Sequence, residues 1–153
     1  MNRRNLTLSL LTTCAAVCFE IRRAAAWALI TAEELEREKM TPQLAASPIE
    51  AQPGAPTIEV EQPDATKPIK SPVSVRVRFK PQEGATIIPE SFRAKYGWLG
   101  IDVTDRITAN AKIDSSGLVA NNAEVPAGKY KLTLQIEDSL HRVGTRVLEF
   151  SVL

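Results

Sequence analysis

The stretch from Pro126 to Leu153 constrains the fold more than any other part of this chain. Between Tyr130 and Glu137, apolar residues alternate with polar ones, and Leu148, Phe150 and Val152 repeat the alternation near the end. A period of two indicates strands that have one buried face and one solvated face. Turn-forming residues separate the two runs. We therefore expect a long antiparallel hairpin whose apolar face needs a second sheet to cover it.

The same alternation predicts further strands upstream. We expect them at residues 57–61, 73–80 and 92–96, as two short strands on either side of a bend within 101–113, and at 118–125, where Asn121-Asn122 interrupts the pattern. No stretch after Thr57 shows a helical period. About seven short strands separated by turn residues are typical of an all-β antiparallel sandwich, which we place at residues 55–153.

The N-terminus has the pattern of an export signal. Arg3 and Arg4 precede 14 uncharged residues, Leu6 to Phe19, and small alanines follow at 24–26 and 28. We expect residues 1–26 to be a signal peptide that is cleaved between Ala26 and Ala28. The alternative is an uncleaved N-terminal anchor, although the apolar run is shorter than the roughly 20 residues that span a bilayer. Lipidation at Cys14 or Cys18 is disfavoured by the residues that precede each cysteine.

Export would leave a mature chain with limited chemistry. Both cysteines lie in the expected signal, so the mature chain would have no disulfide, no thiol nucleophile and no cysteine metal site. Residues 1–26 also hold four of the 19 basic and one of the 18 acidic residues, and the remaining 15 and 17 give a net charge of −2. We expect a periplasmic or extracellular protein that neither binds nucleic acid nor inserts into a membrane after cleavage.

Residues 27–54 read as a short helix followed by a linker. Thr31 and Glu34 form a capping box at the start of a helix that reaches Met40, and a helix this short is marginal in isolation. Four prolines with alanine, serine and glycine follow in residues 41–56. That composition is typical of an extended spacer, and the alternative is a proline-rich docking segment for a partner.

The last hairpin resembles that of a known class of domain. Residues 123–138 followed by Glu-Phe-Ser-Val at 149–152, together with the strand around Ser71 to Lys80, are similar to bacterial immunoglobulin-like and fibronectin-like domains. The resemblance covers residues 55–153 and implies an immunoglobulin-like sandwich, with Tyr130 at the position of a tyrosine corner. It implies little about function, because sandwiches host many functions.

A narrower resemblance concerns copper. Residues 126–130, 141–144 and the terminal Phe-Ser-Val resemble the end of the periplasmic copper-resistance sandwich family. That family combines an N-terminal histidine with an aspartate and a histidine near the last hairpin. His141 is the one histidine of this chain, and one imidazole does not make a histidine-rich copper site. The resemblance therefore favours the fold and disfavours the metal.

Two groups of side chains are candidate binding surfaces. Arg76 and Arg78 continue with Lys80 along one polar strand face, which suits either an anionic ligand or, as we favour, a solvated face beside acidic neighbours. Tyr96 and Trp98 lie at an apolar corner, where Trp98 serves either as a platform for a sugar or peptide or, as we favour, as a plug at one end of the sandwich.

Acidic residues near turns offer oxygen ligands for calcium. The candidates are Asp102, Asp105 and Asp138, with Asp114 and Glu137 as further carboxylates. They lack the spacing of an EF-hand loop, so we favour ordinary turn carboxylates. His141, Asp138 and Ser139 share one loop, whereas a catalytic triad needs residues that converge from separate elements. We therefore expect no enzyme activity and no cofactor.

These observations favour an exported, non-catalytic immunoglobulin-like module that acts in protein–protein interaction or scaffolding. The expected partner is another exported or envelope protein. The alternative is a small ligand-binding module for calcium or carbohydrate.

Overall fold

The computed structural model describes residues 26–42 and 52–153, which form nine strands and two helices. The expected signal peptide and the middle of the expected linker fall on residues 1–25 and 43–51, outside the described residues. In chain order the elements are β1 (Trp27–Ala28), α1 (Ala32–Met40), β2 (Thr57–Gln62), β3 (Val73–Lys80), β4 (Ile87–Tyr96), β5 (Ile101–Asp102), α2 (Thr104–Asn110), β6 (Ala111–Asp114), β7 (Gly117–Glu124), β8 (Gly128–Asp138) and β9 (Val143–Val152).

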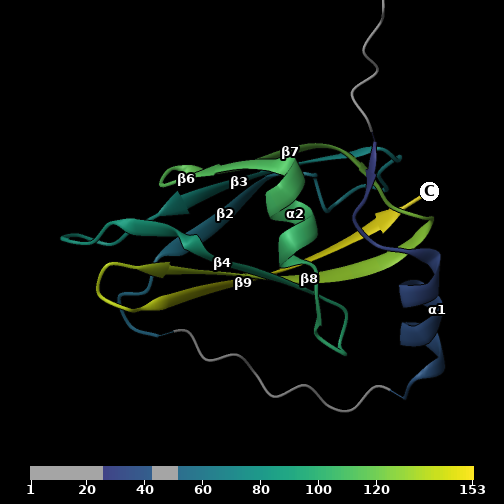
Figure 1. Cartoon of the computed structure of the whole chain (residues 1–153), viewed down its shortest axis with the longest axis horizontal. Helices are drawn as coiled ribbons and strands as arrows, with labels where there is room; N and C mark the ends of the chain where they lie inside the picture. The colour runs from purple at the N-terminus through teal and green to yellow at the C-terminus, as the bar shows by residue number, and fades with distance from the viewer. Residues whose placement is uncertain (1–25, 43–51) are drawn as a thin grey trace, which may run out of the picture.

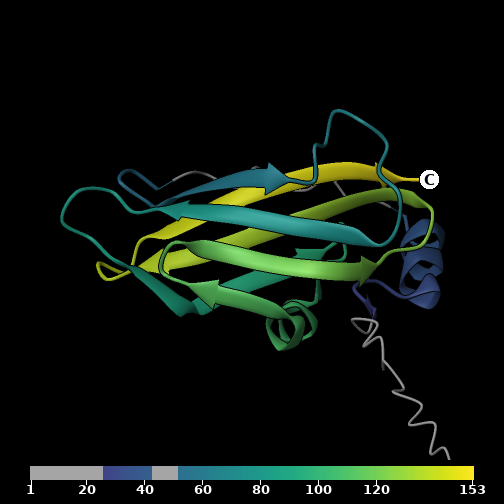
Figure 2. The ribbon, with the colours of Figure 1, turned by 90° about the horizontal axis from the view of Figure 1, so that it is seen from above.

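The strands form two sheets that face each other (Figure 1). The first sheet has the order β1-β7-β3-β2, with β6 also paired to β7, and the second has the order β5-β4-β8-β9. The strands of the first sheet lie side by side when seen from above (Figure 2). Pairing is antiparallel throughout both sheets except between β1 and β7. The expectation of an all-β sandwich is confirmed.

The C-terminal hairpin has the predicted phase. β8 and β9 pair without interruption from Gly128 opposite Val152 to Glu137 opposite Val143. The inward residues are buried on both strands: Tyr130, Leu132, Leu134, Ile136, Leu148, Phe150 and Val152. They form one continuous core with the inward residues of β3, β4 and β7. Alternation along the chain therefore identified the core face of the hairpin correctly.

The interruption at Asn121-Asn122 is a β-bulge. Val73 of β3 pairs with Ala123 of β7, whereas Val75, two residues later, pairs with Ala120, three residues earlier. β7 therefore has one extra residue in this interval. Asn122 has a φ of 56°, a left-handed conformation that asparagine tolerates better than most residues. The bulge keeps both halves of β7 in one sheet.

One segment differs from the prediction. Residues 104–110 form helix α2 rather than a bend and the start of a strand. Asp102 Oδ1 accepts a hydrogen bond of 2.8 Å from the Thr104 backbone N–H at the start of this helix. The buried residues of α2 are Thr104 and Ile107, and two positions in seven residues are too few to show a helical period. In Figure 1, α2 lies between the two sheets at one side of the sandwich.

The folded unit also begins earlier than the expected boundary at Ala55. Trp27 and Ala28 pair in parallel with Ala123 and Glu124 of β7. Leu29 and Ile30 are each 1% exposed, and Leu35 of α1 joins the same core. We call residues 27–42 the N-terminal arm. Because its apolar side chains complete the core, the arm packs as part of the sandwich.

Candidate functional site

A partly buried ion pair attaches the N-terminal arm to α2. The expected capping box is present, with the Thr31 N–H donating to Glu34 Oε2 at 2.9 Å and the Glu34 N–H donating to Thr31 Oγ1 at 3.3 Å. Arg106 adds two bonds of 2.7 Å, from Nη1 to Oε2 and from Nη2 to Oε1 of Glu34. The hydrogen bonds from Arg106 are the main reason that the pKa of Glu34 falls to about 2. The arm is therefore held by charge as well as by its apolar side chains.

A second contact joins α1 to the turn after β4. The Trp98 N–H donates to Glu38 Oε1 at 3.3 Å. Gly97 has a φ of 68°, and a Cβ at this position would overlap the Glu38 carboxylate. The left-handed backbone conformation favours glycine at Gly97, whereas the Glu38 carboxylate is the end of a flexible side chain that could shift away from a Cβ. This contact sets the position of Trp98 relative to the helix.

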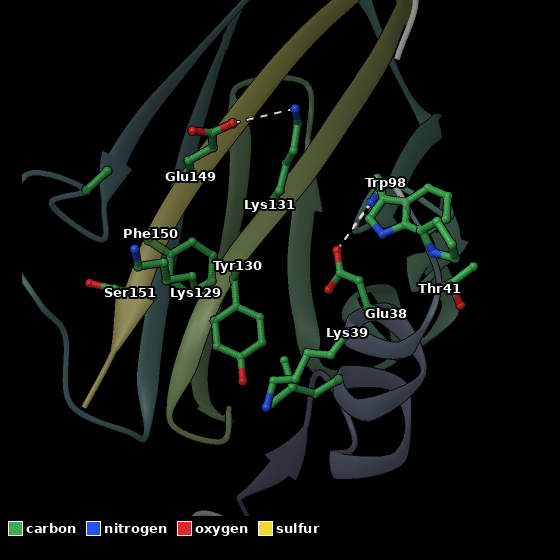
Figure 3. Close-up of a pocket in the computed structure, with 13 residues that line it drawn as sticks. Glu38, Lys39, Thr41, Trp98, Lys129, Tyr130, Lys131, Glu149, Phe150 and Ser151 are labelled. Atoms are coloured by element: carbon green, nitrogen blue, oxygen red, sulfur yellow. Dashed lines mark hydrogen bonds and ion pairs between the residues drawn. The ribbon is translucent and has the colours of Figure 1, made fainter. Parts of the chain in front are cut away.

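Between α1 and the second sheet lies a groove of about 910 Å³, which we call the α1 groove (Figure 3). Its lining residues are Leu35, Glu38, Lys39, Thr41 and Pro42 from the arm; Lys129, Tyr130 and Lys131 from β8; Glu149, Phe150 and Ser151 from β9; and Ala65 and Trp98 from two turns. The rings of Tyr130 and Phe150 are stacked with their centroids 5.5 Å apart. Trp98 is half-buried. Tyr130 and Phe150 are 3% and 5% exposed, so Trp98 is the aromatic side chain that this groove presents to solvent, together with polar and charged side chains.

Three lysines and two glutamates line the α1 groove. Glu38 is engaged by the Trp98 N–H, and Glu149 Oε1 lies 3.5 Å from Lys131 Nζ (Figure 3). Lys39 pairs with Glu36 at 2.9 Å on the exposed side of α1. In the described part of the chain, Lys129 has no carboxylate partner. The lining therefore carries an excess of positive charge.

The two tyrosines of the core differ in their hydroxyl groups. Tyr130 donates a hydrogen bond of 2.7 Å to the Pro126 carbonyl oxygen, and burial raises its pKa to about 12. The Tyr96 hydroxyl is buried and makes no hydrogen bond to any of the described residues. Burial, and then the nearby Glu38 carboxylate, raise the pKa of Tyr96. Because Tyr96 is 0% exposed, the expectation that it contributes to a binding surface is wrong.

The arginine pair lies on a different face of the molecule. Arg76 and Arg78 are on β3 in the first sheet, whereas Trp98 follows β4 in the second. Arg78 pairs with Glu61 and Lys80 with Glu59, each at 2.6 Å. The expectation of acidic neighbours is thus confirmed for these two cations. The two candidate surfaces, Arg76 with Arg78 and Tyr96 with Trp98, therefore belong to different sheets.

The calcium candidates are also separated. Asp102 caps the Thr104 N–H, and Asp105 is exposed in the first turn of α2. Asp138 is 0% exposed and accepts from the Leu140 and Arg142 N–H groups at 2.9 and 3.0 Å, which organises the β8–β9 turn. Asp102 of β5 lies opposite Lys95 of β4, and Lys95 lies opposite Thr133 of β8. Asp138 is several residues beyond Thr133, at the other end of β8. Each carboxylate therefore has a local role in a turn.

His141 is exposed in the same turn, beside Glu137. Across residues 26–42 and 52–153, no group of three or more His, Cys, Asp or Glu side chains is arranged to hold a metal ion. Over the same ranges, no helix has both the length and the apolar character needed to cross a membrane.

Sequence reasoning missed the α1 groove. The capping box identified Glu34, but nothing in the sequence connects it to Arg106, which is 72 residues away. Likewise, no local pattern links Glu38 to Trp98, 60 residues away. Comparison of the chain with protein-family models, curated proteins and solved structures found no match.

Proposed function

We propose that this chain is an exported, non-catalytic module of the immunoglobulin-like class that acts in protein–protein interaction or scaffolding. The strand orders support the class, because β2, β3 and β7 face β5, β4, β8 and β9 across the core. The Tyr130 hydrogen bond supports it further, since a tyrosine near the start of the corresponding strand binds the preceding backbone in such domains.

The α1 groove is the observation that carries the interaction role. Its volume of about 910 Å³ lies within the range of roughly 300–1,000 Å³ that is usual for binding sites. Aromatic residues bury a large area at low conformational cost, which is why they are enriched where proteins bind each other. The α1 wall is held through Glu34 to Arg106 and through Glu38 to the Trp98 backbone, and the opposite wall is the paired strands β8 and β9. A pre-ordered groove costs less to occupy than one that must first be ordered.

A carbohydrate is the second candidate ligand. Trp98 is half-buried beside the hydroxyl and charged groups that line the groove, an arrangement that also suits a sugar ring. The separate positions of Asp102, Asp105 and Asp138 give the calcium alternative no comparable support.

Site-specific photo-crosslinking in the native cells tests the proposal. A photoreactive residue replaces Lys129 in the α1 groove, and a matched control replaces Arg76 on the first sheet. We expect one protein of the exported fraction to be crosslinked from position 129 and not from position 76, and the crosslink to be lost when Trp98→Ala is added. Equal labelling from both positions, or no protein crosslink from position 129, would reject the interaction role of the groove.

A further inference from the structure

The outer face of the second sheet carries a row of cations that leads into the α1 groove. Residues directly opposite one another on neighbouring strands point to the same side of a sheet. Arg93 faces Gln135, Lys95 faces Thr133, Lys131 faces Glu149 and Lys129 faces Ser151. Since the intervening residues of β8 are buried in the core, all four cations lie on the outer face. We call Arg93, Lys95, Lys129 and Lys131 the basic row.

The basic row is poorly neutralised compared with the other sheet. Its acidic neighbours on the outer face are Asp102, which also accepts from the Thr104 N–H, and Glu149, which is 3.5 Å from Lys131. Glu137 lies further along β8 on the same face, beside His141. Within the described ranges, no ion pair joins Arg93, Lys95 or Lys129. On the first sheet, by contrast, the ion pairs of Arg78 and Lys80 are both 2.6 Å long. The cations of the basic row are therefore less engaged in ion pairs than Arg78 and Lys80 are.

The position of the basic row matters because it is continuous with the groove. Lys129 and Lys131 belong to both, so positive charge extends from the sheet into the groove, whose opposite wall carries Glu38 beside Trp98. This positive charge is local to the surface, because residues 27–153 as a whole have 15 basic and 17 acidic residues. A ligand that matches this surface has carboxylates for the lysines and an apolar side chain for Trp98.

From this complementarity we infer that the α1 groove and the basic row together bind an extended acidic peptide segment of a partner protein. The inference rests on the proposed interaction role of the groove and adds the chemistry of the partner. Carboxylates of the segment pair with Lys95, Lys129 and Lys131, and an apolar side chain packs against Trp98. Exposed ion pairs are individually weak, so binding depends on several of them together and weakens as salt is added.

Binding to defined peptides tests the inference on the intact protein. The probe is a fluorescently labelled, end-capped peptide of three Asp-Pro-Leu-Glu repeats, in which proline favours an extended chain. The matched peptides replace the acids by Asn and Gln, or by Lys. We expect fluorescence anisotropy to show saturable binding of the acidic peptide, at least about tenfold weaker binding of the neutral one, and a steep loss of affinity between about 50 and 300 mM salt. Equal affinity for the acidic and neutral peptides would overturn the inference.

Charge reversal locates the site. We expect Lys95→Glu with Lys129→Glu to weaken binding of the acidic peptide by about tenfold or more, because each change replaces attraction by repulsion. Arg76→Glu is the matched control on the first sheet, and we expect it to leave the affinity within about twofold, since exposed charges beyond a Debye length are screened. The replaced residues are exposed, and the melting temperature of each variant verifies that the fold is retained. An equal loss in Arg76→Glu would mean non-specific attraction and would overturn the inference.

Two further outcomes separate the inference from the function on which it rests. If a partner protein is crosslinked from the groove but the acidic peptide does not bind, the interaction role stands and the acidic segment is wrong. If the anionic polysaccharide polygalacturonate binds more tightly than the acidic peptide and its binding is lost in Trp98→Ala, the ligand is a glycan, and both the peptide and the protein partner are rejected.

Discussion

Glu34 and Arg106 join two short helices through a fork of two hydrogen bonds, each 2.7 Å long. Glu34 belongs to the N-terminal arm and Arg106 to the helix that lies between the sheets. The same carboxylate also caps the first turn of α1. One side chain therefore couples the local start of a helix to the tertiary position of the whole arm, and with it one wall of the α1 groove.

The first prediction concerns this ion pair. We expect Arg106→Met to lower the free energy of unfolding at pH 7 by about 1–2 kcal/mol, because hydrogen bonds to charged groups contribute about 1.5–3 kcal/mol and Arg106 is partly exposed to solvent. The pKa of Glu34 is lowered from 4.5 to about 2 in the folded state. The contribution of the Glu34 carboxylate to the free energy of unfolding is therefore complete above pH 4.5 and is lost as the pH falls through about 2.

Urea melts of wild type and variant across this pH range measure the difference. Arg37→Met, at an exposed cation of α1, is the control and should have little effect at any pH. A difference that persists unchanged at pH 2 would show that Arg106 acts through packing rather than through the Glu34 carboxylate.

The second prediction contrasts the two buried tyrosines. Tyr130→Phe removes the hydrogen bond to Pro126, and we expect it to cost about 0.5–1.5 kcal/mol. Tyr96→Phe removes a buried hydroxyl that makes no hydrogen bond within residues 26–42 and 52–153, so it should be neutral or stabilising. Thermal or urea denaturation of the two variants provides the comparison. A larger loss of stability in Tyr96→Phe than in Tyr130→Phe would show that the Tyr96 hydroxyl makes a stabilising hydrogen bond.

The third prediction tests the phase of β8. Leu134 is 3% exposed, and we expect Leu134→Ala to cost about 2–5 kcal/mol. Thr133 points to the outer face, and Thr133→Ala should stay within about 0.5 kcal/mol. A domain of this size has only about 5–15 kcal/mol of stability, so the first variant should be close to unfolding. Since a one-residue slip would exchange the faces, the reverse order of effects in urea melts would reject the register.

The fourth prediction concerns calcium. Asp102 and Asp138 already accept hydrogen bonds from neighbouring backbone N–H groups, and they lie at different positions along the second sheet. We expect millimolar calcium to change the melting temperature by less than about 1 °C, because a ligand raises it only by binding the native state preferentially. A rise of several degrees that is abolished by Asp102→Asn would instead establish a calcium site.

The fifth prediction concerns export. We expect the mature chain to begin at Trp27 or at Leu29, as the small residues at 24–28 indicate. Trp27 lies in β1 and donates from its indole Nε1 to the Asn121 carbonyl at 2.9 Å, so the second site would remove β1. N-terminal sequencing of protein from the periplasm or medium distinguishes the two. Recovery of the chain from the cytosol with Met1 intact would contradict export.

The sequence was most informative where a pattern repeats. β3 was predicted at its observed bounds, and the inward faces of β8 and β9 were predicted residue by residue. Helix α2 was missed because Thr104 and Ile107 are too few buried positions to reveal a period. The alternation that identified β4 and β8 could not distinguish Tyr96 from Tyr130. Both side chains are buried, and only Tyr130 has a hydrogen-bond acceptor among the described residues.

What the sequence by itself determined is therefore local: which residues alternate, where turns break the strands, and that Thr31 and Glu34 begin a helix. Only the tertiary structure decided that Leu29 and Ile30 complete the core, that Arg106 reaches Glu34, and that Lys129 and Trp98 line one groove. The physical reason is that a face of a strand is defined by neighbours along the chain. A groove or an ion pair depends on which distant segments the two sheets bring together.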